Sequence, residues 1–396
     1  MSIKVGKQGA IIKATCPCAH CLILRVQIAI FLRNSFSTSP VRMPRRSPAH
    51  RTTSRKKQHV EITLTKDVRF RGKTTGLERL EFVHNALPEL NFDEIDTRTL
   101  FLGKELSLPL MVSCMTGGYA GALNINRDLA AVCESVRICL GIGSQRQALE
   151  ESRYHRTFSV VREAAPTIPI VGNIGAAEVA RMKDASAVLR LAGLVRADAF
   201  AVHLNPLQEF LQPEGNPAFR GVLEGIGMLV RSLPIPLIVK EIGAGLSPDV
   251  IRRLLDAGVR IIDVAGAGGT SWAGVEALRR TDTGLAGRFW DWGIPTARAL
   301  ADAASLRSEG RQMTLIASGG ISSGLDAAKC IALGADMAAS ARPMLAALHR
   351  GGKKGLRVHI EEWSKEFRGT MFLTGSARIT DLRSAKLVSY PDRDTR

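Results

Sequence analysis

The residues between His203 and Glu209 combine side chains that could do chemistry. They include the imidazole of His203, the amides of Asn205 and Gln208, and the carboxylate of Glu209. A carboxylate beside an amide in a phosphate site is typical of a Mg²⁺ ion held by few protein oxygens. The alternative for Glu209 is a helix N-terminal acid that complements the helix dipole, and for His203 it is a hydrogen-bonded core residue. Spacing alone leaves these alternatives open.

Lysine and glycine positions further along the chain are suited to an anionic ligand. Lys240 ends an apolar run, and burying an unpaired ammonium is costly. We therefore expect Lys240 to contact a ligand anion, such as the electron-rich pyrimidine end of a flavin. Ser318-Gly319-Gly320 and Ala341-Arg342 follow two later apolar runs, and adjacent glycines let backbone N–H groups approach a phosphate. The alternative for Gly319-Gly320 is a plain turn.

Two more motifs are weaker when taken singly. Gly268-Gly269-Thr270-Ser271-Trp272 is glycine-rich but lacks the Walker lysine and the full dinucleotide fingerprint. Arg55-Lys56-Lys57-Gln58-His59 precedes all the other motifs. Such a charge run is usually a solvated surface, but it could equally be a flexible arm that clamps an anionic substrate.

Short apolar runs alternate with helix-like stretches and must position these residues. Eight runs have the length and the near-continuous apolar character of buried parallel strands: Leu108–Cys114, Arg137–Ile142, Ile168–Gly172, Ala199–His203, Pro236–Val239, Arg260–Val264, Met313–Ala317 and Asp336–Ser340. Helices are expected between them, for example over Leu123–Ser135, Ser247–Asp256, Thr296–Leu306 and Gly324–Leu333. This alternation predicts an α/β fold, a (β/α)₈ TIM barrel. The competing fold is a doubly wound open sheet.

The informative residues all follow the predicted strands. In a TIM barrel, the loops after the carboxyl ends of the strands meet at one end and form the active site. Polar residues and glycines follow every one of the eight runs. We therefore expect one site that draws on all eight loops.

Composition allows a large core but separates a basic extension from it. Of the 396 residues, 45% are hydrophobic and 23% are charged, which is ordinary for a globular protein. The formal net charge is +17, and residues 1–54 contain nine lysines and arginines but no acidic residue. We expect this extension to be disordered. A basic tail could also bind nucleic acid or an anionic membrane, but no groove-reading motif accompanies it.

Cysteine usage favours a reducing, cytoplasmic compartment. The seven cysteines are odd in number and show no disulfide framework. Cys16-Pro17-Cys18-Ala19-His20-Cys21 could suggest a metal cluster, but no second ligand pair follows at zinc-finger spacing. The apolar stretch Cys21–Leu32 is too short and too polar to span a bilayer. It could be a signal or transit peptide, or translation could start at Met43.

The chain is accordingly divided into four segments. We predict a basic extension over 1–54, a substrate arm and lead-in over 55–107, a barrel over 108–350, and a C-terminal helical segment over 351–396.

In this order and spacing, the motifs resemble those of the type 2, FMN-dependent isopentenyl-diphosphate delta-isomerases. The resemblance begins at about Arg55 and runs to the C-terminus, and His203–Glu209 discriminates best against other FMN barrels. Two departures are Cys114, where a smaller residue is expected, and the extension before Met43. The matching motifs are Arg55-Lys56-x-x-His59, Met115-Thr116-Gly117-Gly118, Gly143-Ser144-Gln145-Arg146, His203–Glu209, Lys240-Glu241-x-Gly243, Gly268–Trp272, Ser318-Gly319-Gly320 and Ala341-Arg342-Pro343.

The resemblance implies cofactors, partners and site residues. It implies FMN, active in its reduced form, with Mg²⁺, with NADPH as reductant, and with a small-molecule diphosphate as substrate. It also implies a homo-oligomer, a tetramer or octamer, with no nucleic-acid or membrane partner. The FMN-binding residues would be Met115, Thr116, Gly117, Ser144, Asn173, Lys240, Thr270, Gly319, Gly320, Ala341 and Arg342. The substrate-binding residues would be Arg55, Lys56, His59, Arg146 and Gln208, the catalytic residues Gln208, His203 and Asn205, and the metal ligand Glu209.

The implied reaction interconverts isopentenyl and dimethylallyl diphosphate in isoprenoid biosynthesis by reduced-flavin-assisted allylic proton transfer. An unactivated alkene needs a strong, well-placed acid, and few side chains serve near neutral pH. A reduced flavin can supply a proton donor and acceptor over the alkene, and its negative charge can stabilise a developing cation. Gln208 would then orient the substrate or relay protons.

Two other functions compete with this one. An FMN-dependent 2-hydroxy-acid oxidase or dehydrogenase would need a base and an arginine for the substrate carboxylate. The His-Gly-x-Arg arrangement of such enzymes does not follow the seventh run. A non-enzymatic flavin-storing or nucleic-acid-binding protein is disfavoured by the density of polar residues at one end of the predicted barrel.

Overall fold

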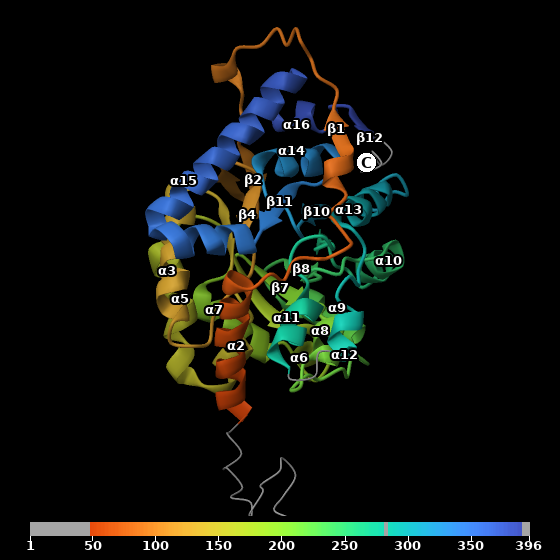
Figure 1. Ribbon diagram of the computed structural model, residues 1–396. Helices are drawn as coiled ribbons and strands as arrows, with labels where there is room; N and C mark the ends of the chain where they lie inside the picture. The colour runs from red at the N-terminus through yellow and green to blue at the C-terminus, as the bar shows by residue number, and fades with distance from the viewer. Residues whose placement is uncertain (1–47, 281–283, 390–396) are drawn as a thin grey trace, which may run out of the picture. The chain divides into compact units, whose positions relative to one another are not determined.

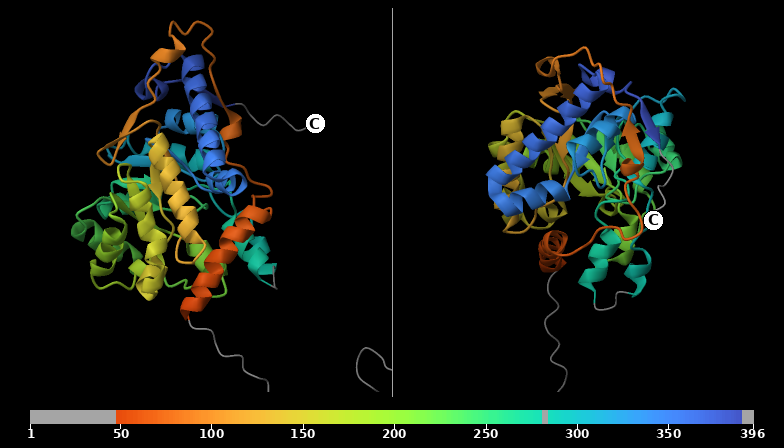
Figure 2. Two further views of the ribbon diagram at one scale, coloured as in Figure 1. Left: turned by 90° about the vertical axis from the view of Figure 1, so that its left-hand side faces the viewer. Right: turned by 45° about the horizontal axis from the view of Figure 1, so that its top comes forward.

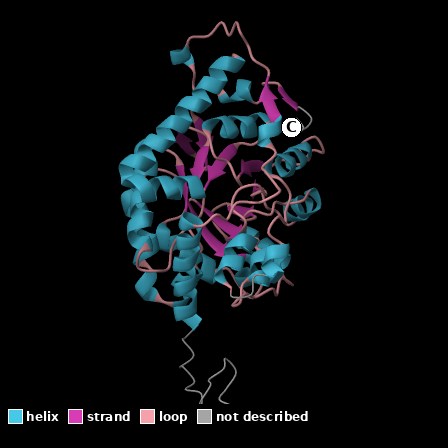
Figure 3. Ribbon diagram, in the orientation of Figure 1, coloured by secondary structure: helices cyan, strands magenta, loops and turns pink. Residues whose placement is uncertain are grey.

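Eight parallel strands close into a barrel at the centre of the fold (Figures 1 and 3). The computed structural model describes residues 48–280 and 284–389. The strands are β4 (Leu110–Val112), β5 (Cys139–Gly141), β6 (Ile170–Gly175), β7 (Ala199–His203), β8 (Leu237–Lys240), β9 (Ile261–Asp263), β10 (Thr314–Ala317) and β11 (Met337–Ser340). They follow one another in chain order, and β11 pairs with β4 to close the ring. The predicted TIM barrel is confirmed, each predicted run supplies one strand, and the open doubly wound sheet is excluded.

Helices surround the barrel, as the sequence predicts (Figure 3). The longer ones are α3 (Ala122–Val136), α5 (Arg156–Ala164), α7 (Ser186–Val195), α9 (Val222–Ser232), α10 (Pro248–Asp256), α13 (Thr296–Ser305), α14 (Gly324–Ala332) and α15 (Arg342–Thr374). Shorter helices occupy the loops: α4 (Arg146–Glu150), α6 (Ala176–Val179), α8 (Pro206–Leu211), α11 (Trp272–Arg279), α12 (Gly284–Arg288) and α16 (Ile379–Leu382). The four helices named from the sequence are present within two residues at each end.

Apolar side chains fill the barrel on two sides of its wall. Inside the ring, Val171, Ala201, Ile238, Ile261 and Ile316 belong to one buried cluster. Outside the ring, a larger buried cluster joins the strands to the helices around them. Since successive strand residues point to opposite faces, both faces of each strand must be apolar, which explains the near-continuous apolar runs.

The predicted lead-in segment closes the amino-terminal end of the barrel. Strands β2 (Thr99–Phe101) and β3 (Lys104–Leu106) form an antiparallel hairpin, and Phe101 and Leu106 belong to the cluster inside the ring. Lys104 forms an ion pair of 2.6 Å with Asp198, which immediately precedes β7. The hairpin therefore covers the end of the barrel opposite the strand carboxyl ends.

Both ends of the described chain differ from the predicted segments. Helix α2 (Pro48–Thr65) includes the last seven residues of the predicted extension. The predicted boundary at 350 lies inside α15, where Gly352 has a φ of 58° that kinks the helix. Strand β12 (Leu387–Ser389), which was not predicted, pairs with β1 (Leu80–Phe82). Residues 48–54 of the predicted disordered extension are therefore helical, and the rest of it, with Cys16–Cys21 and the Met43 start, lies outside the described residues.

Helix α2 crosses the carboxyl-terminal side of the barrel and contacts α4, α11 and α15 (Figure 2). Arg342, at the start of α15, donates a 2.9 Å hydrogen bond to the carbonyl of Thr63 near the end of α2. The helix is thereby held against the loops that follow the strands. In the described part of the chain, no helix has the length and apolar character needed to cross a membrane.

Arg162 on α5 stabilises the junction of two strands. Its buried guanidinium donates to the carbonyls of Ile168 and Arg196 at 2.9 and 2.8 Å and to Asp198 at 2.6 Å. We predict that Arg162→Met lowers the free energy of unfolding by about 3 kcal/mol, because it leaves buried acceptors unpaired. Urea unfolding of both proteins measures this.

Arg156→Met is the matched control for this experiment. Arg156 lies on the same helix and pairs with Glu163, but both side chains are more than half exposed, so little stability should be lost. Equal losses in the two variants would contradict the role assigned to Arg162.

Candidate active site

A layer of polar side chains caps the apolar interior at the carboxyl ends of the strands. On β6 to β10, the residues two positions beyond the inner cluster, and so on the same face, are Asn173, His203, Lys240, Asp263 and Ser318. All except His203 are buried, with Asp263 fully so. The barrel therefore presents a polar, charged surface to whatever occupies the space above it.

Above this layer lies an open cavity of about 990 Å³, its mouth included. Predicted cofactor-binding residues lining it are Met115, Thr116, Gly117, Ser144, Asn173 and Lys240. Predicted substrate-binding, catalytic and metal-binding residues lining it are Arg55, Lys56, His59, Arg146, His203, Asn205, Gln208 and Glu209. Side chains from a segment before the barrel and from six of its loops are thus brought to one space.

Helix α2 delivers three of these residues from outside the barrel. Arg55, Lys56 and His59 recur at helical spacing on one half-buried face, while Lys57 and Gln58 are exposed. Lys56 Nζ donates to the Ser144 carbonyl at 2.6 Å. Burial, followed by the neighbouring Arg55 cation, lowers the pKa of Lys56 to about 7.

Helix α8 begins directly after β7 because Pro206 suits its first turn. The Asn205 amide donates to Gln208 and to Glu209, both at 3.0 Å. The other oxygen of Glu209 accepts from the Asn216 backbone at 2.6 Å. Among the described residues, no donor reaches the buried Asn205 Oδ1. The loop therefore holds one buried acceptor and one carboxylate beside the cavity.

His203 is held as a neutral imidazole. Its Nδ1 lies 2.9 Å from Asn173 Oδ1. Burial, and then the cationic charge of Lys240, lower the pKa of His203 to about 3. The imidazole is therefore uncharged at neutral pH, and its position favours a hydrogen-bonding role over proton donation.

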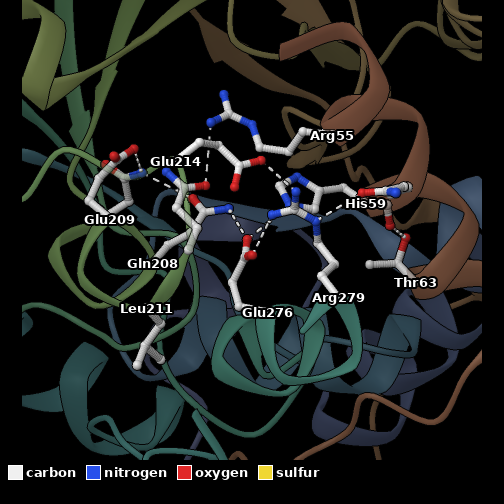
Figure 4. A network of polar contacts seen from close by, with 12 residues as sticks. Arg55, His59, Thr63, Gln208, Glu209, Leu211, Glu214, Glu276 and Arg279 are labelled. Carbon is white, nitrogen blue, oxygen red and sulfur yellow. Dashed lines mark hydrogen bonds and ion pairs between the residues drawn. The ribbon is translucent and has the colours of Figure 1, made fainter. Parts of the chain in front are cut away.

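Glu276 on α11 joins the arm to α8, and the sequence analysis missed it (Figure 4). Its fully buried carboxylate accepts from His59 at 2.9 Å, from Gln208 at 3.4 Å and from Arg279 at 2.5 Å. Burial raises the pKa of Glu276, but the bonds from His59 and Arg279 outweigh it, so the pKa is lowered. An acidic residue within the apolar stretch of α11 was the signal that could have identified it.

The glycine motifs lie beside the cavity, behind a segment of the chain. Arg69 forms a bridge with Thr270, and added Cβ atoms at Gly268 and Gly320 would collide with Thr75. Five predicted cofactor-binding residues, Thr270, Gly319, Gly320, Ala341 and Arg342, do not line the cavity in the described structure. The structure therefore brings six of the eleven predicted FMN-binding residues to the cavity, and the other five do not line it.

The residues that line the cavity fit a flavin. Lys240 Nζ donates to the Glu241 carbonyl at 2.6 Å, which leaves ammonium protons for a ligand. An added Cβ at Gly143 would collide with the Thr116 backbone, so glycine keeps the loops after β4 and β5 close together. Cys114, the departure noted above, is half-buried here, and burial raises its pKa to about 11, so its thiol is uncharged at neutral pH.

Comparisons with known proteins agree with this geometry. The FMN-dependent dehydrogenase family model matches residues 188–389. An isopentenyl-diphosphate delta-isomerase of Pelodictyon phaeoclathratiforme is 49% identical over 353 residues, covering 86% of this chain and 98% of that protein. One of Methanothermobacter thermautotrophicus is 43% identical over 336 residues, covering 85% and 93%.

Among solved structures, two mandelate oxidases share the fold. A variant enzyme aligns with a TM-score of 0.59 at 18% identity, covering 87% of this chain and 99% of its own. Another aligns with a TM-score of 0.58 at 17% identity, covering 85% and 98%. Identities this low show a common barrel and nothing of the reaction. The much higher identity to the isomerases, over nearly their full length, decides the relationship: the chain belongs to the type 2, FMN-dependent isopentenyl-diphosphate delta-isomerase family.

Proposed function

We propose that this protein interconverts isopentenyl diphosphate and dimethylallyl diphosphate in isoprenoid biosynthesis. The observation that carries the proposal is the position of α2, which faces Arg55 and Lys56 toward a cavity floored by Lys240 and Asn173. Cations at the mouth suit a diphosphate, and the polar floor suits the flavin ring. A substrate held between them would have its hydrocarbon end over the flavin.

Reduced FMN, when bound, would supply a proton donor and acceptor for the allylic shift. Six FMN-binding residues are those at the cavity floor and the loops after β4 and β5: Met115, Thr116, Gly117, Ser144, Asn173 and Lys240. Thr270, Gly319, Gly320, Ala341 and Arg342 are proposed for the phosphate end of the cofactor. NADPH is proposed as the reductant.

Substrate is proposed to bind through Arg55, Lys56, His59, Arg146 and Gln208. Arg146 is held by Glu150 and Glu178, each at 3.0 Å, so its guanidinium is already oriented at the cavity wall. Glu276 fixes Gln208 and His59 relative to each other. Gln208, with His203 and Asn205, would orient the alkene and relay protons at the reacting end.

Glu209 is the proposed ligand for Mg²⁺. In the described structure, no group of three or more His, Cys, Asp and Glu side chains lies close enough to hold a metal ion. Magnesium commonly binds one or two carboxylates and completes its shell with substrate phosphates and water. Glu209 would therefore hold the ion, whose positive charge would help to bind the diphosphate.

We further propose a cytoplasmic homo-oligomer, a tetramer or an octamer. All four cysteines in the described part of the chain are free, in agreement with a reducing compartment. Phe210 and Trp292 are 49% and 58% exposed, and both contact the ring of Phe289. An exposed aromatic group of this kind is typical of a subunit interface.

Anaerobic incubation with isopentenyl diphosphate, FMN, Mg²⁺ and NADPH should yield dimethylallyl diphosphate, detected by product analysis. The competing hydroxy-acid oxidase is tested in parallel by adding mandelate to the oxidised protein and following the flavin absorbance. We expect no bleaching, because the substrate cations are placed for a diphosphate. Bleaching by mandelate without turnover of isopentenyl diphosphate would overturn the proposal.

Glu209→Gln should raise the Mg²⁺ concentration for half-maximal activity by about tenfold or more, since a charged ligand becomes neutral. A magnesium titration at saturating FMN measures this. Asp249→Asn is the control, because it removes an exposed carboxylate on α10 that does not line the cavity. An unchanged half-saturation in Glu209→Gln would remove Glu209 from the metal site.

Substrate binding should weaken as the pH rises through about 7. Below its pKa of about 7 Lys56 is cationic and can bind diphosphate, and above it the charge is lost. We expect kcat/KM to fall by up to about tenfold per pH unit above that point, chiefly through KM. Lys56→Arg keeps its charge and should flatten the profile. Identical profiles for wild type and Lys56→Arg would assign the titration to another group.

A further inference from the structure

We propose that Asp263 is the positioning residue of Lys240, holding its ammonium group at the floor of the cofactor cavity. The two residues are register partners on the neighbouring strands β8 and β9. Both lie two residues beyond the apolar cluster inside the barrel, so both side chains point into the ring. Asp263 Oδ2 lies 3.5 Å from Lys240 Nζ. The inference rests on the proposed binding of FMN above this layer.

The two oxygens of Asp263 have different surroundings. Oδ1 accepts from the Ser318 hydroxyl at 2.6 Å and from the Ala265 backbone at 3.2 Å. Within the described structure, Oδ2 has no hydrogen-bond partner, although Asp263 is fully buried. A buried carboxylate is costly unless a nearby cation compensates it. Lys240 is in place to supply that charge, and the free oxygen is the one that faces it.

The neighbouring carboxylate of Glu241 does not compete for this role. One of its oxygens accepts from the backbone of Ile242, Gly243 and Ala244, at 2.6, 2.7 and 2.5 Å. Glu241 therefore shapes its own loop. Lys240 takes only a neutral carbonyl from it, at 2.6 Å. The negative charge that balances Lys240 comes from Asp263, across the strand pair.

The Asp263–Lys240 pair keeps the positive charge of Lys240 at the floor of the cavity, where a bound flavin would lie. Without Asp263, the Lys240 ammonium would be a buried cation with one neutral acceptor, and it would leave the floor of the cavity. A flavin above it would then lose a cation that favours its negatively charged reduced form. Asp263 acts through Lys240 and has no need to touch the cofactor.

The test compares Asp263→Asn with Lys240→Met and with the double variant. Asp263→Asn keeps the shape of the side chain and an acceptor for Ala265, but removes the charge. We expect it to weaken FMN affinity about ten- to a hundredfold, and to shift the midpoint potential of bound FMN negative, as in Lys240→Met. The double variant should show no further shift beyond that of Lys240→Met. Ser318→Ala removes the other side-chain partner of Asp263 but keeps its charge, and should shift the potential less than Asp263→Asn does.

Three results would overturn the proposal. They are an unchanged potential in Asp263→Asn, a positive shift, or a shift of equal size when Lys240 is already Met. If Asp263→Asn does not fold, the yields of folded apoprotein are compared for Lys240→Met and the Asp263→Asn/Lys240→Met double variant. The double variant should give the higher yield, because Lys240→Met alone leaves an unpaired buried carboxylate. If the double variant does not yield more folded protein than Lys240→Met, Asp263 serves only its hydrogen bonds with Ser318 and Ala265.

The proposed function is tested separately on the wild-type protein. Turnover of isopentenyl diphosphate is measured in the same preparations. A wild-type protein that binds FMN but does not isomerise this substrate would overturn the proposed function. The Asp263 inference would then stand or fall on the affinities and potentials alone.

Discussion

The closed ladder of eight parallel strands is the constraint on which the rest of the structure depends. Because neighbouring strands are parallel and β11 pairs with β4, all eight carboxyl ends face the same side. The alternation of side chains then sets which residues point inward at each level. A ring of apolar residues is followed, two positions later, by a ring that contains Asn173, His203, Lys240 and Asp263. The register of the strands thus places residues that are far apart in the sequence side by side on one surface.

On that surface, charged side chains are buried from solvent. Burial of Asp263 and Lys240 is tolerable because each lies opposite the other, with Ser318 and two backbone groups completing their contacts. The buried carboxylate of Glu276 on α11 is likewise compensated, because it accepts hydrogen bonds from His59, Gln208 and Arg279. In both places, the cost of desolvation fixes partners and orientation more strictly than an exposed ion pair would.

Helix α2 shows how a segment outside the barrel becomes part of the site. Helical spacing gathers Arg55, Lys56 and His59 on one face of α2, and contacts with other elements turn that face toward the cavity. Arg342 holds the end of the helix through the Thr63 carbonyl, Glu276 holds His59, and the Ser144 carbonyl accepts from Lys56. The segment after α2 then crosses the glycine motifs near Thr270. Helix α2 and the loops that follow the barrel strands are therefore one packed assembly.

The sequence by itself determined the barrel, its eight strands and most of the residues around the cavity. It could do so because doubly buried strands need near-continuous apolar runs, and because polar residues after such runs must meet at one end of the barrel. Only the tertiary structure decided the pairing of Asp263 with Lys240, the central position of Glu276, the hydrogen bond from Arg342 on α15 to α2, and the segment that covers the glycine motifs. These contacts join residues separated by tens to hundreds of positions. Their partners are set by register and packing, which no local pattern of residues encodes.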